Sequence, residues 1–138
     1  MHNFPNPVTF RIYWEDTDAG GVVYYANYLK FFERARTEWL RTLGVEQNAL
    51  RADTGAMFVV AEVNVRYRAP AKLDDRIVVT VEVLGRGTAS LNIVQQAWRG
   101  EVLVADAKVR IGCVDAATLR PRRIPRQALD AIAAHSER

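Results

Sequence analysis

One long amphipathic helix followed by a series of strand patterns constrains the fold of this chain more than any other feature of its sequence. From about Ala26 to Leu43, apolar residues recur every three or four positions, the spacing of one face of an α-helix. Gly44 follows, and glycine ends a helix in the left-handed conformation without a Cβ clash. From about Val63 to Cys113 the apolar period changes to two, which is typical of strands with one buried face. The pattern therefore predicts a helix that packs against a sheet.

Regular alternation of apolar and polar residues predicts the strands. One precedes the helix and four follow it, at about residues 8–14, 62–68, 77–83, 91–96 and 103–113. The connections between the later strands are short, which suits antiparallel neighbours better than crossovers. Pro125 can open a short terminal helix at 126–135. The order predicts an α+β fold, with an antiparallel sheet of about five strands wrapped around one long central helix.

The composition fits a single domain over residues 1–138. Of the 138 residues, 49% are hydrophobic and 25% are charged, which is enough apolar material for a real core. No apolar run approaches the roughly 20 residues of a membrane span, and the N-terminus lacks the basic-then-apolar layout of a signal peptide. Cys113 is the only cysteine, so an internal disulfide is excluded. These features predict a cytoplasmic protein without a transmembrane segment.

Elimination removes the common nucleophile and histidine chemistries. The only histidines are His2 and His135, at the two ends, where chains commonly fray. Ser90 lies in a strand pattern and Ser136 in the terminal tail, and neither has a Gly-x-Ser-x-Gly surrounding. Cys113 lies on the apolar phase of the last strand and reads as a small core residue. The sequence therefore disfavours serine or cysteine catalysis and leaves the carboxylates.

An acidic loop leads directly into the long helix. Glu15, Asp16 and Asp18 are followed by Gly20-Gly21, where the main chain can approach a ligand closely. The first turn of a helix carries unpaired N–H groups and partial positive charge, which stabilise an oxyanion, while a nearby carboxylate can attack or activate water. The alternative is an ordinary turn in which the aspartates satisfy local backbone donors. A metal site is disfavoured because the further ligands of a calcium loop are missing.

Aromatic residues surround the helix entrance. Tyr24, Tyr25 and Tyr28 either line a pocket or belong to the core, and aromatic residues at such positions are more often core. Asn27 either fixes the loop through hydrogen bonds or caps the helix. Glu33 is expected on the solvated face.

The net charge of +3 is unevenly distributed. Arginines crowd the C-terminal part, at Arg120, Arg122, Arg123 and Arg126. Such a segment can meet nucleic acid, an anionic membrane, an acidic carrier protein or the phosphates of a coenzyme. The alternative is a solvated, turn-rich exit from the last strand. The acidic first loop argues against nucleic acid, which requires a continuous basic face.

The run from Tyr13 to Tyr28, with its Glu-Asp-Thr-Asp-Ala-Gly-Gly-Val-Val-Tyr core, and the following Phe32 to Glu38 resemble a known family. The family that these runs resemble is the hot-dog-fold acyl-CoA thioesterases of the 4-hydroxybenzoyl-CoA thioesterase superfamily, in particular the branch associated with the Tol–Pal envelope system. Further similarity lies at residues 67–75, 86–88, 113–115 and 120–122. The resemblance covers nearly the whole chain, and its first motif is specific.

The resemblance implies an acyl-CoA thioesterase whose catalytic carboxylate is Asp18, with the backbone N–H of Tyr25 polarising the thioester carbonyl. Relatives can carry histidine at the position of Tyr25, so only a backbone role is open here. Arg86 and Thr88 are candidate contacts to the coenzyme A moiety, because phosphate favours arginine and a loop hydroxyl; the alternative is an ordinary hairpin. Coenzyme A belongs to the substrate, and no cofactor or metal is expected.

The family also implies assembly. Its subunits pair their sheets edge to edge with the active sites at the dimer interface, so we expect a homodimer or a homotetramer. A second hypothesis is a non-catalytic adaptor that binds acyl thioesters or acyl carrier protein at the cell envelope, motivated by the basic C-terminal segment. A hot-dog dehydratase is a weaker third hypothesis, because related dehydratases rely on a histidine that this loop lacks.

Overall fold

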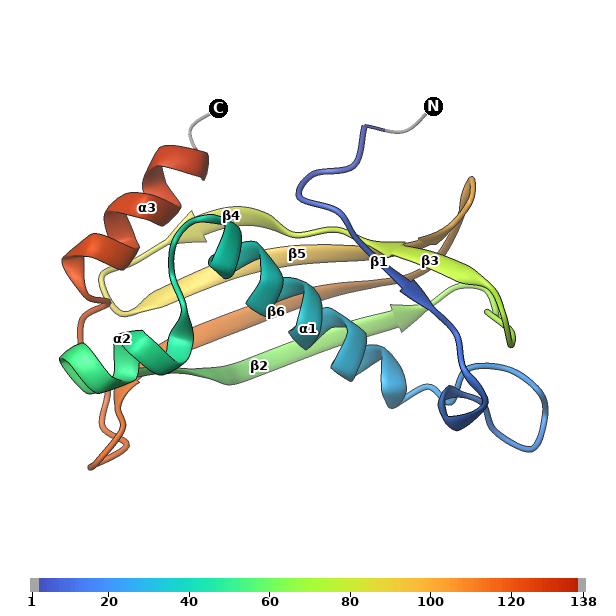
Figure 1. Cartoon of the computed structure of the whole chain (residues 1–138), viewed down its shortest axis with the longest axis horizontal. Coiled ribbons are helices and arrows are strands. Elements are labelled where there is room, and N and C mark those ends of the chain that lie inside the picture. Colours follow the sequence, from blue (N-terminus) through green and yellow to red (C-terminus); the bar gives the residue numbers. More distant parts are fainter. Residues whose placement is uncertain (1–2, 137–138) are drawn as a thin grey trace.

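A six-stranded antiparallel sheet wraps around one long helix in the computed structural model, which describes residues 3–136 (Figure 1). The expected α+β architecture is confirmed; His2 lies outside the described residues. The elements in chain order are β1 (Val8–Arg11), α1 (Asn27–Thr42), α2 (Gln47–Thr54), β2 (Ala56–Tyr67), β3 (Arg76–Val79), β4 (Glu82–Arg86), β5 (Ser90–Arg99), β6 (Val102–Asp115) and α3 (Arg126–Ser136). The strand order is β1-β3-β5-β6-β2, and β4 also pairs with β5.

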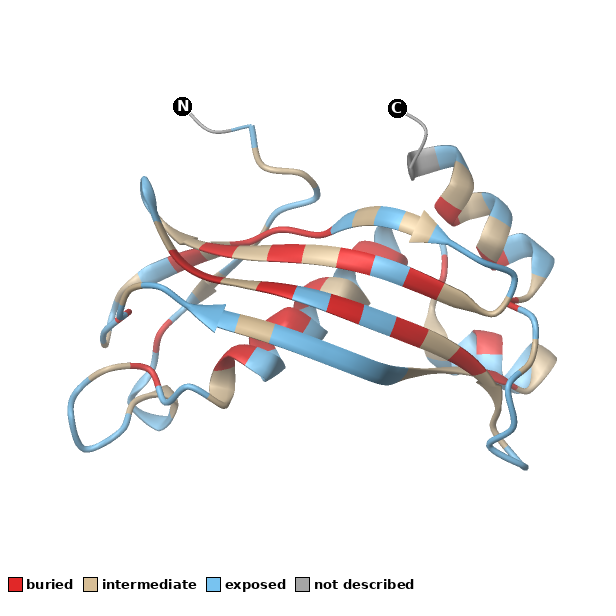
Figure 2. Cartoon of the chain, turned by 180° about the vertical axis from the view of Figure 1, so that it is seen from behind, coloured by how far each residue is buried: buried red, intermediate tan, exposed pale blue. Residues whose placement is uncertain are grey.

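Helix α1 buries the face that its periodicity predicts. The buried residues of α1 are Tyr28, Phe31, Phe32, Ala35, Trp39 and Leu40. Buried and exposed residues alternate along β5 and β6, so that one face of the sheet meets α1 (Figure 2). Gly44 takes a φ of 82° just after the helix, and its N–H donates to the carbonyl of Arg41, as the sequence predicts. Burial of this apolar face is the main stabilising contribution of α1.

The strand expected at 77–83 is two strands, so the sheet has six strands rather than about five. Thr80 still donates its N–H to the Gln96 carbonyl on β5 at 2.8 Å. The return bond differs from a regular ladder: Gln96 donates its N–H to the Thr80 hydroxyl at 3.0 Å, while the Thr80 carbonyl accepts a hydrogen bond from the Gln95 side chain at 3.3 Å. These side-chain bonds interrupt the backbone ladder with β5, which separates β3 from β4.

Two local elements differ from the sequence prediction. The first strand ends at Arg11, and Trp14, predicted on its buried phase, lies in a 3-10 turn with 80% of its surface exposed. Helix α2 was not predicted, although its start has an ordinary cap: the Glu46 carboxylate accepts hydrogen bonds from the N–H groups of Asn48 and Ala49. Leu50 is the single buried residue of α2, so the helix shows no apolar periodicity, and the cap alone does not predict a helix.

Strand pairing places two ends of the sheet far apart. On β5, Leu91 pairs with Arg86 at one end and Trp98 pairs with Val78 at the other. The seven residues from Leu91 to Trp98 span roughly 23 Å at the rise of a strand. We call these the Leu91 end and the Trp98 end of the sheet. Every feature of the candidate site belongs to one of them.

Strand β2 is a long sheet edge. It pairs with β6 over its whole length, from Ala56 against Asp115 to Tyr67 against Ala105, and its other edge has no strand partner within the part of the chain that the structure describes. Val60 and Val63 on this strand are exposed. An unprotected edge of twelve residues is a template for pairing with another strand.

Candidate active site

A tight turn holds the Asp18 loop beside the entrance of α1. Asp18 donates its N–H to the Val22 carbonyl at 2.9 Å, and Gly21 donates back to the Asp18 carbonyl at 3.0 Å. Gly21 has a φ of 81°, which explains the glycine. Val23 donates to the Ala71 carbonyl at 2.8 Å, which ties the loop to the segment before β3. The loop therefore sits at the Trp98 end of the sheet.

The Asp18 carboxylate is held by one oxygen and open at the other. Its Oδ1 accepts a hydrogen bond from the Gly20 N–H at 2.8 Å, and a Cβ on residue 20 would lie 3.2 Å from that oxygen. Its Oδ2 has no hydrogen-bond partner among residues 3–136, and the side chain is exposed. Asp18 thus combines the predicted turn with a second carboxylate oxygen that has no partner within the described residues.

The entrance of α1 presents unpaired backbone donors. Tyr24 donates its N–H to the Asp16 carbonyl at 2.9 Å, and Asn27 donates its own to the Tyr24 carbonyl at 2.9 Å. Between them, the N–H groups of Tyr25 and Ala26 have no acceptor in the described part of the chain. Asn27 also donates through its side chain to the Asp16 carbonyl at 2.9 Å, so it fixes the loop rather than capping the helix. Such free N–H groups can stabilise a negative charge that develops on a substrate oxygen.

A row of tyrosines joins the helix entrance to the end of β2. The ring of Tyr25 lies 4.9 Å from that of Tyr24 and 5.9 Å from that of Tyr67, and Tyr67 lies 5.6 Å from Tyr28. Tyr28 is buried, which confirms the core interpretation for this residue, whereas Tyr24 and Tyr25 are exposed. That they line a pocket stays a prediction. A side-chain hydrogen bond with Tyr25 raises the pKa of Tyr24, and burial raises the pKa of Tyr67. The phenols of Tyr24 and Tyr67 therefore stay protonated at neutral pH.

Arg86 and Thr88 do not join Asp18 within one chain. Arg86 ends β4 and Thr88 follows two residues later, both exposed and both at the Leu91 end of the sheet. There the Thr88 carbonyl accepts a hydrogen bond from the Ile124 N–H at 2.8 Å. The Asp18 loop lies at the Trp98 end, roughly 23 Å away along β5. A site that uses all three residues therefore requires two copies of the chain.

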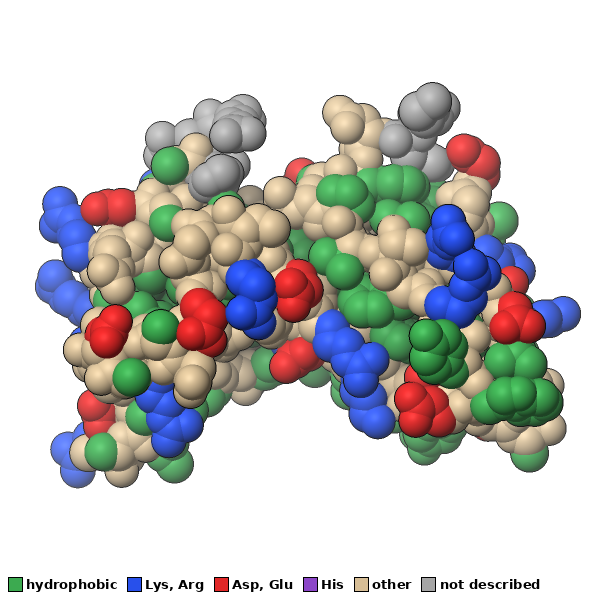
Figure 3. Space-filling view, viewed as in Figure 1, with side chains coloured by type: hydrophobic (Ala, Val, Ile, Leu, Met, Phe, Trp, Pro, Cys, Tyr) green, Lys and Arg blue, Asp and Glu red, His purple; other side chains and the backbone are tan. Residues whose placement is uncertain are grey.

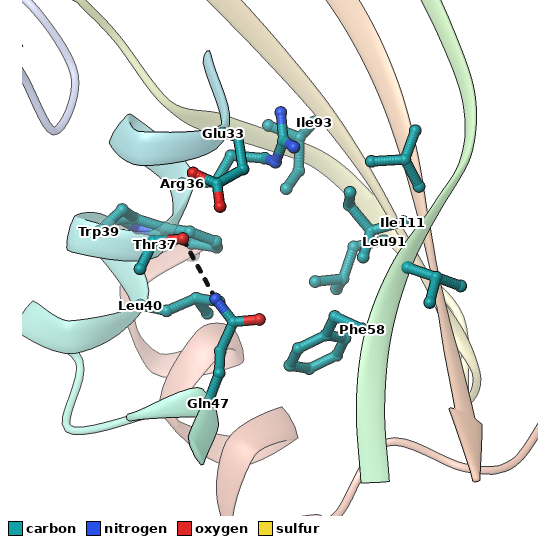
Figure 4. Close-up of a pocket in the computed structure, with 12 residues that line it drawn as sticks. Glu33, Arg36, Thr37, Trp39, Leu40, Gln47, Phe58, Leu91, Ile93 and Ile111 are labelled. Atoms are coloured by element: carbon teal, nitrogen blue, oxygen red, sulfur yellow. Dashed lines mark hydrogen bonds between the residues drawn. The ribbon is translucent and has the colours of Figure 1, made fainter. Parts of the chain in front are cut away.

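A cavity of about 140 Å³ lies between α1 and the sheet (Figure 4). Its residues come from the second half of α1, from Gln47 and from strands β2, β5 and β6. The lining consists of Glu33, Arg36, Thr37, Trp39, Leu40, Gln47, Phe58, Val59, Val60, Leu91, Ile93 and Ile111. It belongs to the Leu91 end of the sheet. Glu33, predicted to be only a solvated position, is exposed but also lines this cavity.

A buried polar group at this cavity escaped the sequence analysis. Arg36 donates from Nη1 to Oε1 of Gln95 at 2.9 Å, and Gln95 donates from Nε2 to the carbonyls of Phe32 and Thr80 at 3.0 and 3.3 Å. Gln95 has no exposed surface. Burial lowers the pKa of Arg36, while the nearby Glu33 raises it. The signal was available, because Gln95 lies on the same strand phase as Leu91 and Ile93.

The remaining candidates have structural roles or scattered positions. Arg122 donates from Nη1 to the Thr54 carbonyl at 2.6 Å, so part of the arginine-rich segment holds the fold together. Cys113 is buried, as predicted, and burial raises its pKa. Acidic and basic side chains are interspersed on the face seen in Figure 3. Within residues 3–136, no cluster of three or more metal-ligating residues occurs, and no helix is long and apolar enough to cross a membrane.

Comparisons with known proteins agree on one family. The family model of the thioesterase-like superfamily matches residues 12–132. The chain is 43% identical over 126 residues to the acyl-CoA thioesterase YbgC of Haemophilus influenzae, covering 91% of each protein. It is 45% identical over 117 residues to the acyl-CoA thioester hydrolase YbgC of an Escherichia coli strain, covering 84% of this chain and 87% of the relative.

Solved structures have the same fold. A probable thioesterase from Bartonella henselae superposes with a TM-score of 0.81 at 33% identity, over 86% of this chain and 98% of that one. A Staphylococcus aureus protein solved in complex with CoA superposes with a TM-score of 0.89, over 96% of this chain and 84% of that one. At 17% identity, the second similarity concerns the fold alone.

Proposed function

This chain belongs to the thioesterase-like superfamily and has its hot-dog fold, and from that premise we propose that it hydrolyses acyl-CoA to a carboxylic acid and free coenzyme A. We propose that each chain forms one domain over residues 1–138, and that Asp18 and the Tyr25 N–H are its catalytic groups. The observation that carries the proposal is the unpaired Tyr25 N–H at the entrance of the helix that follows the Asp18 turn.

In the proposed mechanism, one group stabilises the negative charge that develops on the thioester carbonyl oxygen, and a second group attacks the carbonyl carbon or activates water. The thioester carbonyl oxygen accepts a hydrogen bond from the Tyr25 N–H, where the helix dipole also favours negative charge. Asp18 either attacks the carbonyl carbon or removes a proton from an attacking water. The carbon–sulfur bond then breaks, and the coenzyme A thiolate takes a proton from water or from the protonated Asp18 that the water route produces. In the direct-attack route, water then hydrolyses the acyl–Asp18 anhydride, which releases the carboxylic acid and restores the carboxylate. The protein needs no metal or cofactor for either route.

The proposed active unit is a homodimer formed through the free edge of β2. A two-fold axis at the midpoint of this strand brings the Leu91 end of one protomer beside the Trp98 end of the other. Arg86 and Thr88 of one copy then approach the Asp18 of the second copy, where they can bind the phosphates of coenzyme A. The same arrangement buries the exposed Val60 and Val63. A tetramer can form from two such dimers.

Turnover of acyl-CoA by the purified protein tests the proposed function. We expect release of free thiol from short acyl-CoA, followed with a thiol reagent, at a rate proportional to enzyme concentration. The adaptor hypothesis, in which acyl thioesters or an acyl carrier protein are bound but not cleaved, predicts saturable binding without thiol release. Binding with no turnover across acyl chains of several lengths and an acylated carrier protein would replace the hydrolase by the adaptor.

Mixed dimers test the shared site. We expect the native protein to have at least twice the chain mass of 15.6 kDa in solution. Arg86→Ala should raise KM about tenfold or more, since a charged hydrogen bond to phosphate is lost. A heterodimer of Asp18→Asn and Arg86→Ala chains, purified through two different tags, should show about half of the wild-type kcat with a wild-type KM, because one of its two sites is intact. Half of the wild-type kcat with the raised KM of Arg86→Ala, in a stable heterodimer, would mean that both residues act within one protomer.

A further inference from the structure

The cavity beneath α1 combines apolar walls with one cationic donor. Leu40, Phe58 and Ile93 form much of its wall, while Arg36 and Glu33 come from the helix (Figure 4). Its volume of about 140 Å³ is close to that of protein cavities, about 150 Å³, that bind a benzene ring. The space therefore fits a short acyl chain or one ring, not a long fatty chain.

Arg36 has hydrogen-bonding capacity to spare. A guanidinium carries five N–H donors, and within the described residues Arg36 uses one of them, toward Gln95. No side-chain nitrogen or oxygen is buried without a partner among residues 3–136, so the remaining donors are in contact with accessible space. Arg36 lines the cavity, and an acceptor bound there can take these donors. A guanidinium only donates, so the matching ligand atom must be an oxygen that accepts.

The charges around the cavity favour a neutral ligand. Glu33 and Arg36 line the same space and interact electrostatically. Their formal charges cancel, so an anionic group placed beside Arg36 also meets the negative Glu33. A ketone or similar neutral oxygen gains the hydrogen bond without that repulsion. Desolvation of a neutral group also costs less than desolvation of a carboxylate.

We propose that Arg36 is a specificity-determining residue that selects short acyl groups with a neutral oxygen acceptor, bound in the cavity beneath α1. This inference rests on the proposed acyl-CoA hydrolysis and names the class of acyl group that the enzyme prefers. The acyl chain carries its oxo group into the cavity, while its thioester lies at Asp18.

The second protomer supplies this cavity. Along β2, seven residues separate Val60 at the cavity from Tyr67 beside Tyr25, which is roughly 23 Å and too far for a short acyl group in one chain. A two-fold axis at the midpoint of β2 sets Phe58 of one copy opposite Val65 of the other, near Tyr67. Val60 and Glu33 line the cavity and are both exposed, so one side of the cavity is open at the β2 edge. The acyl group thus enters the partner's cavity.

Pairs of acyl-CoA substrates that have the same chain length, one plain and one with an oxo group, test whether Arg36 selects a neutral oxygen acceptor. The substrates are butanoyl- and 3-oxobutanoyl-CoA, pentanoyl- and 4-oxopentanoyl-CoA, and hexanoyl- and 5-oxohexanoyl-CoA, with glutaryl-CoA as the anion. In the wild type, at least one oxo substrate should exceed its plain partner in kcat/KM about tenfold or more, as expected for a hydrogen bond to a charged donor. Arg36→Met should abolish this preference, so that the ratio of kcat/KM within each pair falls to about one. Arg34→Met, on an exposed position of α1, is the matched control and should keep it.

The outcomes separate this inference from the proposed function. Hydrolysis of every pair without an oxo preference, or a preference for glutaryl-CoA, overturns the role of Arg36 and leaves the thioesterase intact. This wild-type measurement decides the matter even if Arg36→Met does not fold. Absence of any hydrolysis contradicts the proposed function itself. In a heterodimer of Asp18→Asn and Arg36→Met chains, the oxo preference should persist; its loss there places the cavity in the same protomer as Asp18.

Discussion

Asp18→Asn is expected to reduce kcat for acyl-CoA hydrolysis by about 10³-fold, with a smaller effect on KM. The amide cannot attack the carbonyl carbon and cannot accept a proton from water. It keeps the side-chain oxygen that receives the Gly20 N–H at 2.8 Å, so the turn can form as before. Loss of rate with an intact fold would identify the carboxylate as a catalytic group. Thiol release at saturating substrate measures the effect.

The control for this substitution is the neighbouring carboxylate Glu15. Glu15→Gln removes the same charge from the same exposed loop and should leave kcat within about twofold, since most surface substitutions have small effects. Thermal unfolding of both variants should match that of the wild type. If Asp18→Asn retains full turnover, the catalytic assignment of Asp18 is wrong. Equal losses in both variants would instead point to the charge of the loop.

Tyr25→Pro is expected to lower kcat by about 10²- to 10³-fold, the typical effect of removing one oxyanion donor. Proline has no backbone N–H, so the substitution deletes the donor that has no acceptor in the described part of the chain. Because the donor strengthens its bond as charge develops on the carbonyl oxygen, kcat should fall more than KM rises. Single-turnover measurements of thiol release isolate the chemical step.

Two variants separate the backbone from the side chain. Tyr25→Phe keeps the N–H and should retain kcat within a few-fold. Ala26→Pro removes the next unpaired N–H, and its φ of −67° already suits proline. If Tyr25→Phe loses as much activity as Tyr25→Pro, the phenol rather than the backbone is the functional group. If Ala26→Pro causes the larger loss, the oxyanion donor is Ala26 and not Tyr25.

Local patterns predicted much of the fold. The apolar face of α1, its end before Gly44 and the strands that follow all came from periodicity, because each side chain reports which face of its own element is buried. The errors fell where a distant segment intervenes. The division between β3 and β4 depends on side-chain hydrogen bonds between Thr80 and the Gln95-Gln96 segment of β5, and no local pattern contains a partner so far away in the chain.

The candidate site divides in the same way. The turn at Asp18 and the helix entrance beside Tyr25 were predicted from the sequence, because a turn and the helix after it are close in the chain. The catalytic roles of both residues came from the family resemblance and stay predictions. The pairing of Arg36 with Gln95 was missed, because 59 residues separate them and the strand phase of Gln95 predicts its burial but not its partner. Arg36 and Gln95 come into contact only because α1 packs across β5.

By itself, the sequence determined the family, the long helix, the run of strands and the carboxylate at its helix entrance, because all of these depend on residues near one another. Only the tertiary structure placed Arg86 and the cavity at one end of the sheet and Asp18 at the other, and these ends lie roughly 23 Å apart along β5. It also left the β2 edge without a partner in the described chain. Distances between elements follow from strand register and packing, which the order of residues along a chain does not express.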